Sequence, residues 1–164
     1  MNGINSNFTW GQTFFGQIPG SIGETSTFLI LLAGAYMVYT KIASWRIIFG
    51  TLAGMIVMSS ALNLIGSDTN PMFAIPWYWH LTIGSFAFGL VYMATEPVSA
   101  ANTNMGRWIY GISIGVIVVL IRVINPAFPE GMMLAILFAN LLAPAIDFTI
   151  TSLNTSRRME RYNS

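Results

Sequence analysis

The chain has 164 residues, of which 54% are apolar and only 8% are charged, and its mean hydropathy is +0.63. A soluble domain carries about 25% charged residues to present a hydrated surface, so this composition excludes a free-standing soluble protein. The net charge of +1 gives no basic footprint for a nucleic acid, and the absence of cysteine excludes disulfides, thiolate nucleophiles and iron–sulfur clusters. We therefore predict an all-α integral membrane protein.

The chain divides into a lead-in, a membrane domain and a tail. Residues 1–23 are expected to lie at the membrane interface, anchored by the aromatic side chains of Trp10, Phe14 and Phe15. Residues 24–153 form the membrane domain, and residues 154–164 form a basic tail. A helix spans a bilayer with about 20 apolar residues, and we expect five transmembrane helices, at about 25–40, 47–66, 73–95, 108–124 and 131–152.

The basic residues predict the orientation of these helices. Six of the seven lysines and arginines fall on one side of the membrane in the five-span arrangement: Lys41, Arg46, Arg107, Arg157, Arg158 and Arg161. Cytoplasmic segments of membrane proteins are enriched in lysine and arginine. We therefore expect a cytoplasmic C-terminus and a periplasmic N-terminus, which an odd number of spans also requires.

Small residues recur at a spacing of four in three of the expected helices. The pairs are Gly50 with Gly54, Ser85 with Gly89, and Gly111 with Gly115. Small residues at this spacing let two helix backbones approach closely. We expect packing between helices of this chain, with contact to a partner subunit as the alternative.

An aromatic run at residues 76–80 lies in the outer half of the third expected span and contains Trp77, Trp79 and His80. One interpretation is an aromatic belt at the membrane interface, with His80 hydrogen-bonded to a neighbouring helix. The other is a wall for a flavin or quinone, because flat ring systems stack on aromatic side chains. The sequence leaves both open.

Arg122 lies within a turn of the outer end of the fourth expected span. A long cationic side chain in this position can extend its charge to the interface. We expect Arg122 to do so and to pair with Glu130 across the following turn. A role in gating is the alternative.

Asp147 lies inside the fifth expected span, about one turn from its cytoplasmic end. Asn140 is seven positions earlier on the same helical face, and Pro144 releases the carbonyl of Asn140 from its helical hydrogen bond. Acids within a membrane are costly and mark ion pathways, and oxygen ligands suit Na⁺. We predict a Na⁺ ligand at Asp147 and an ion pathway that includes Asn140 and the loop acid Glu96. The alternatives are an Asp147 that pairs with the basic tail and a solvated Glu96.

Several long, irregular runs resemble one protein family. They lie at residues 42–47, 66–80, 94–98 and 122–133. These runs resemble the B subunits of the sodium-translocating NADH:quinone reductases, and the resemblance extends from about Trp10 to Arg158. The D subunit of the Rnf complex shares the Ala-Thr-acid-Pro pattern at residues 94–97 but fits residues 68–80 less well.

The resemblance implies a fold and an activity that the composition does not show. The family's B subunit has about ten spans in two related halves, similar to the inverted repeats of urea and ammonium channels, and this chain corresponds to the second half. The complex passes electrons from NADH through flavins and an iron–sulfur cluster to ubiquinone, and it expels Na⁺ across the bacterial inner membrane. The implied partners are the other subunits, ubiquinone, Na⁺ and the lipid bilayer. Asp147 and Glu96 match positions where the family has acids implicated in the sodium path.

The resemblance also implies flavin cofactors. The family's B subunit carries FMN esterified through its phosphate to the threonine of a Ser-Gly-Ala-Thr motif, and the complex also holds riboflavin. This chain has no such motif. The nearest string ends at Thr95 and would face the cytoplasm, so we expect the FMN attachment site to lie outside this chain.

The resemblance makes the chain part of a redox-driven sodium pump, and we do not expect the isolated chain to be active. Two other functions are compatible with the composition. One is half of a solute channel or carrier with no redox role, and the other is a structural anchor for catalytic partners. The first would lack flavin absorbance, and the second would tolerate replacement of Asp147 and Glu96.

Overall fold

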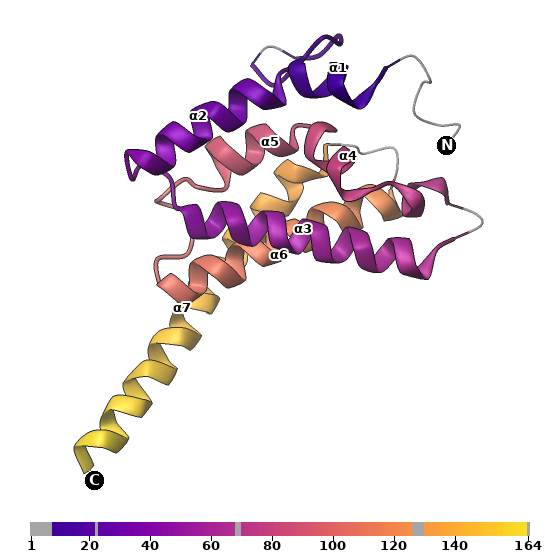
Figure 1. Ribbon diagram of the computed structural model, residues 1–164. Coiled ribbons are helices and arrows are strands. Elements are labelled where there is room, and N and C mark those ends of the chain that lie inside the picture. The colour runs from indigo at the N-terminus through magenta and orange to yellow at the C-terminus, as the bar shows by residue number, and fades with distance from the viewer. Residues whose placement is uncertain (1–7, 22, 68–69, 126–129, 164) are drawn as a thin grey trace.

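The computed structural model describes residues 8–21, 23–67, 70–125 and 130–163 (Figure 1). These residues form helices and no β-strand, in agreement with the expected all-α class. In chain order the helices are α1 (Trp10–Phe15), α2 (Thr27–Tyr39), α3 (Trp45–Ile65), η1 (Pro71–Ala74), α4 (Trp77–Thr82), α5 (Phe86–Phe88), η2 (Gly89–Met93), α6 (Asn104–Ile124) and α7 (Gly131–Asn163).

Three of these helices are long and apolar enough to cross a membrane. They are Trp45–Ile65, Asn104–Ile124 and the Gly131–Arg161 part of α7, and they confirm the second, fourth and fifth expected spans. Helix α2 is apolar but has only 13 residues, fewer than the roughly 20 that a straight crossing of a bilayer needs. The first expected span is therefore present as a shorter helix.

Glycines bring α3 and α6 into direct backbone contact. A Cβ atom on Gly111 would lie 2.7 Å from the carbonyl oxygen of Ile47, closer than van der Waals contact permits. A Cβ atom on Gly115 would collide in the same way with the carbonyl oxygen of Thr51. Since only glycine leaves room for this approach, the expected packing between helices of this chain is confirmed for the two Gly-x-x-x-Gly motifs.

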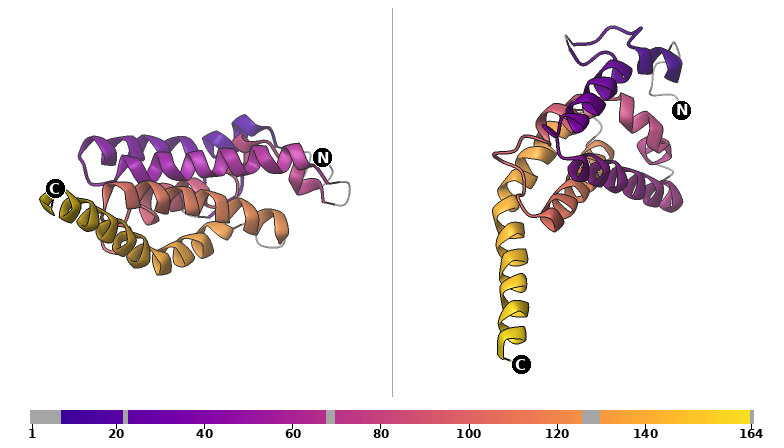
Figure 2. Two further views of the ribbon diagram at one scale, coloured as in Figure 1. Left: turned by 90° about the horizontal axis from the view of Figure 1, so that it is seen from below. Right: turned by 60° about the vertical axis from the view of Figure 1, so that its left-hand side comes forward.

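Helix α7 packs along α6 in its first half and then leaves the helical body, as Figures 1 and 2 show. Met132 and Ala135 of the first half are fully buried, whereas Leu137, Leu141 and Phe148 are exposed. Exposed apolar side chains on a membrane helix suit contact with lipid tails. The helix continues through the expected boundary between the membrane domain and the basic tail.

The third expected span, 73–95, is not one continuous helix, and the expectation of an unbroken helix there is wrong. The one-turn helix η1 and the short helix α4 come first, and the chain then breaks at residues 83–85. It resumes as α5 and η2, where η2 is a π-helix. Hydropathy does not reveal this break, because no charged residue interrupts the segment between Pro71 and Thr95.

The N-terminal part of the chain covers the interrupted segment. Ile30 of α2 is buried in a small cluster with Ala87 and Val91 of α5 and η2. The indole Nε1–H of Trp10 in α1 donates a hydrogen bond to the carbonyl oxygen of Tyr78 in α4, at 3.1 Å. The lead-in therefore packs against α4.

Candidate functional site

The break between α4 and α5 interrupts backbone hydrogen bonding within an apolar segment. Ile83 is extended, with φ −93° and ψ 140°. Gly84 and Ser85 follow in the left-handed region, with φ of 61° and 57°. Glycine adopts this conformation freely, whereas a residue with a side chain requires about 1 kcal/mol. The break leaves carbonyl groups near it without partners inside a helix.

Arg122 of α6 donates hydrogen bonds to these carbonyl groups. One terminal nitrogen donates to the carbonyl oxygen of His80 at 2.8 Å. The other donates to the carbonyl oxygens of Ile83 at 2.5 Å and Gly84 at 2.8 Å. The guanidinium also lies over the ring of Phe86, 5.7 Å from its centroid. One cation thus connects both sides of the break to α6.

The sequence interpretation of Arg122 was wrong in one respect. The side chain does not extend to the interface, because it is 1% exposed and bound inside the fold. Burying a charge requires compensating hydrogen bonds, and the three carbonyl groups supply them. These partners lie about 40 residues earlier in the chain, so local sequence could not reveal them. The pairing with Glu130, which is exposed, stays a prediction.

The aromatic run of α4 does not form one wall. Trp77 and Tyr78 line an apolar groove of about 320 Å³ together with Trp10 of α1. Trp79 and His80 do not line it, and His80 is 2% exposed, on the inner side of α4. Of the three predicted cofactor residues, the structure therefore brings Trp77 to an open aromatic surface and separates it from His80.

Asp147 binds the N-terminus of α6. Its Oδ2 accepts a hydrogen bond from the backbone N–H of Asn102 at 2.6 Å. Its Oδ1 accepts from the N–H and the hydroxyl of Thr103, at 3.0 and 2.6 Å. The Thr103 hydroxyl in turn accepts from the N–H of Gly106 at 3.0 Å. A negative charge at a helix N-terminus is favourable, so Asp147 connects α7 to the start of α6.

Asn140 also faces α6, so the prediction that it shares a helical face with Asp147 is confirmed. Its side-chain oxygen accepts a hydrogen bond from the hydroxyl of the fully buried Tyr110, at 2.5 Å. Asn140 and Asp147 therefore both bind the N-terminal part of α6. Sequence reasoning missed Tyr110 and Thr103, whose hydroxyls carry no distinctive local pattern.

Glu96 is bound within its own loop. Its carboxylate accepts hydrogen bonds from the hydroxyl of Ser99 at 2.6 Å, the N–H of Ser99 at 2.9 Å and the N–H of Val98 at 3.2 Å. The Ser99 hydroxyl, followed by the Ser99 and Val98 amides, holds the pKa of the Glu96 carboxyl below its usual value. Glu96 is therefore an ionised loop acid that also shapes the turn after η2.

The oxygen atoms at this end of α6 could contact a cation only in part. Within the described residues, no group of three or more His, Asp or Glu side chains could hold a metal ion. A carboxylate has about four lone-pair positions, and donors occupy three at Asp147. The described oxygen atoms therefore do not form a complete cation cage.

Thr95 does not fit a site for covalent FMN. Thr95 is 5% exposed, and its hydroxyl donates to the carbonyl oxygen of Val91 at 2.6 Å. A buried hydroxyl that is already hydrogen-bonded inside a helical turn is not placed to accept a flavin phosphate.

Comparison with known proteins decides the family. The model of the NQR2, RnfD, RnfE family matches residues 2–155. The chain belongs to this family. It is 61% identical over 160 residues to the B subunit of the Na(+)-translocating NADH-quinone reductase of Stutzerimonas stutzeri (strain A1501). It is 62% identical over 160 residues to the protein of the same name from Ectopseudomonas mendocina (strain ymp).

These two alignments cover 98% of this chain but only 40% of each relative. A relative from Neisseria meningitidis (serogroup A, strain Z2491) bears the same name and is 61% identical over 155 residues. Membership of this family, together with the apolar helices, identifies a multi-pass membrane protein.

Proposed function

We propose that this chain is part of the membrane-embedded B subunit of a sodium-translocating NADH:quinone reductase, a pump that couples electron transfer from NADH to ubiquinone to Na⁺ export. The observation that carries the proposal is 61% identity over 98% of the chain to a protein of that name. The runs that resemble the family and the three long apolar helices support it.

For the topology, we propose five membrane crossings, with the interrupted segment α4–η2 as the third. The N-terminus is periplasmic and the Arg157–Arg158 tail is cytoplasmic, in the inner membrane of a bacterium. Support comes from Lys41, Arg46 and Arg107, which line one pocket and therefore lie at one end of the helical body. In this arrangement the chain forms one of two inverted five-helix repeats, consistent with its coverage of 40% of its relatives.

For the ion, the proposed pathway passes the N-terminal part of α6, which Asp147 and Asn140 contact, and it includes the loop acid Glu96. Asp147 is the proposed Na⁺ ligand. Of the three described hydrogen bonds to its carboxylate, Oδ2 accepts only one, so Oδ2 keeps a lone pair for a cation. Asn140 offers its side-chain oxygen, which Tyr110 would release by rotating its hydroxyl. Hydrated or exchanging Na⁺ suits such a weak, oxygen-lined set.

For the cofactors, FMN is covalently attached outside this chain and riboflavin is held by the complex. The aromatic surface of Trp77 is the proposed contact for a flat ring, because it is 45% exposed and borders an apolar groove. Trp79 and His80 do not line this groove, and His80 is buried.

The proposal is tested on the complex that contains this chain, in inverted membrane vesicles supplied with NADH and a quinone. Asp147→Asn should raise the Na⁺ concentration for half-maximal quinone reduction, because the proposed Na⁺ ligand loses its negative charge. Thr103→Val is the matched variant that tests whether Asp147 acts only by capping the N-terminus of α6. It removes a hydrogen-bond donor from Asp147 and keeps the carboxylate, so it should lower the thermal unfolding midpoint and leave the Na⁺ titration unchanged. Glu160→Gln, an exposed acid far along α7, controls for charge.

If Asp147→Asn and Thr103→Val lower only stability, Asp147 is a cap and not a ligand. If the assembly oxidises no NADH and shows no flavin absorbance, the reductase function itself is wrong. A solute channel or carrier is then the better interpretation.

A further inference from the structure

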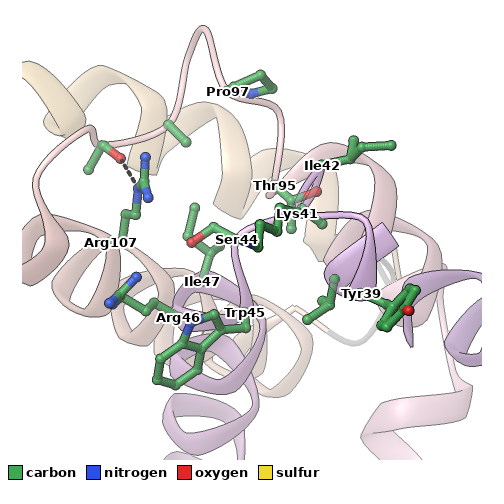
Figure 3. A pocket seen from close by; sticks show the side chains of 14 residues that line it. Tyr39, Lys41, Ile42, Ser44, Trp45, Arg46, Ile47, Thr95, Pro97 and Arg107 are labelled. Carbon is green, nitrogen blue, oxygen red and sulfur yellow. Dashed lines mark hydrogen bonds between the residues drawn. The ribbon is translucent and has the colours of Figure 1, made fainter. Parts of the chain in front are cut away.

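A basic pocket of about 520 Å³ lies where the α2–α3 loop, the start of α3, the 95–101 segment and the start of α6 meet. Figure 3 shows Lys41, Arg46 and Arg107 around it, from the loop, α3 and α6 respectively. The pocket does not overlap the hydrogen-bonded groups of Asp147 or Asn140. We take it as a site separate from the proposed ion pathway.

The charge around this pocket is one-sided. Lys41, Arg46 and Arg107 line it, and no carboxylate is among its described lining residues. Arg107 is partly balanced, because it interacts with the charge of Asp147 and donates to a backbone carbonyl at 3.3 Å. Arg46 lies over the ring of Trp45, 4.9 Å from its centroid. The surplus positive charge favours an anion.

Hydrogen-bond donors accompany this charge. Ser44 is the N-cap of α3, but its side chain makes no cap hydrogen bond. Its Oγ is buried and has no hydrogen-bond partner among the described residues. The pocket is lined by Ser44 and by Trp45 and Arg46 of the first turn of α3, whose N–H groups lie at the positive end of the helix. A phosphate oxygen would satisfy the hydroxyl and contact the cations together.

The rim of the pocket is apolar and exposed. Tyr39 is 85% exposed, Ile42 is 62% exposed and Trp45 is 43% exposed, and all three line the pocket. A small soluble anion would not contact these apolar side chains, whereas the acyl chains of a lipid would cover them. Basic pockets between membrane helices on the cytoplasmic side bind anionic head groups.

From this geometry we propose that the pocket binds the phosphate group of an anionic phospholipid, with Lys41, Arg46 and Ser44 as its main contacts. Arg107 adds longer-range attraction. The lipid would hold the α2–α3 loop against the start of α6. Free phosphate shares the same chemistry, and the test separates the two sources.

The test uses the chain purified from membranes with any subunits that accompany it, then delipidated in a nonionic detergent. The thermal unfolding midpoint is measured while phosphatidylglycerol, phosphatidylcholine or inorganic phosphate is added. Lys41→Gln with Arg46→Gln is the pocket variant. Arg157→Gln with Arg158→Gln removes the same charge from the exposed end of α7 and is the matched control.

Phosphatidylglycerol should raise the midpoint of the parent, and phosphatidylcholine should do so much less. Each cation removed from the pocket should raise the half-saturating phosphatidylglycerol concentration about fivefold. The pocket variant should therefore need roughly 25-fold more lipid, while the control changes less than about twofold. If the double variant misfolds, Lys41→Gln alone, in the exposed loop, should still show the fivefold change.

Equal weakening in the pocket and control variants would show diffuse surface attraction and overturn the proposal, as would equal effects of the two lipids. If inorganic phosphate alone stabilises the parent and not the pocket variant, the phosphate site stands. The assignment to a lipid is then wrong.

Discussion

Replacement of Arg122 tests how much the interrupted segment depends on one side chain. Arg122→Met keeps the apolar stem and removes all donors, which leaves the carbonyl groups of His80, Ile83 and Gly84 without the hydrogen bonds that Arg122 provides. A buried polar group left unsatisfied costs about 1–3 kcal/mol. Three of them, after neighbouring groups relax, should lower the free energy of unfolding by roughly 3–6 kcal/mol.

Arg122→Lys retains the charge but loses the planar fork that spans both sides of the break. Its ammonium group can donate from a single point only, so the loss should be smaller, about 1–3 kcal/mol. We therefore also predict that Arg122→Met destabilises the protein more than Arg122→Lys does.

The assay is thermal unfolding in detergent, followed by tryptophan fluorescence. For a chain of this length about 1 kcal/mol shifts the midpoint by roughly 2–4 °C, so a loss of roughly 3–6 kcal/mol in Arg122→Met should lower the midpoint by roughly 6–24 °C. Arg158→Gln, an exposed cation of α7, should stay within about 2 °C. A midpoint of Arg122→Met within about 2 °C of the parent would refute the role assigned to Arg122.

Three further predictions concern other parts of the chain. Gly115→Ala should lower the free energy of unfolding by about 1–3 kcal/mol, because its Cβ would strike the α3 backbone. Gly11→Ala, where a Cβ meets nothing within 4 Å, should be neutral in the same thermal assay, and equal unfolding midpoints of the two variants would contradict the packing. The stabilising contribution of ionised Glu96 is present above its unfolded pKa and is lost as pH falls through its lowered folded pKa. Ser99→Ala should raise the folded-state pKa of Glu96, measured by infrared titration of the carboxyl group. An unchanged titration midpoint would contradict the role of Ser99. After co-expression with a flavin transferase, the isolated chain should give no in-gel flavin fluorescence, whereas a fluorescent band would return Thr95 to consideration.

The sequence predicts those parts of the fold that depend on local composition and spacing. The three long spans follow from uninterrupted apolar runs, and the close approach of another helix at Gly111 and Gly115 follows from their spacing of four, although the spacing does not say that this helix is α3. The break at residues 83–85 does not follow, because one glycine within an apolar run is common in membrane helices. It is held open by Arg122, whose partners are 38–42 residues away.

In the candidate ion pathway too, the sequence predicts local relations between residues but not contacts between distant segments. The shared face of Asn140 and Asp147 follows from their separation of seven positions on one helix. Their partners Tyr110 and Thr103 are 30 and 44 residues away, and only the packing of α7 on α6 brings them together. The sequence could therefore select the acids but not show that backbone amides and hydroxyls already bind them.

The backbone contact between α3 and α6 also determines where the molecule can deform. Sliding one helix along the other would drive the Gly115 backbone into Thr51, and no flexible side chain lies between them to absorb the displacement. Helices α3 and α6 therefore form a rigid pair. The interrupted segment is different, since it is joined to this pair through the long side chain of Arg122 and has left-handed residues at its break. A conformational change within this chain would therefore concentrate at the interrupted segment, and the hydrogen bonds of Arg122 would limit its extent.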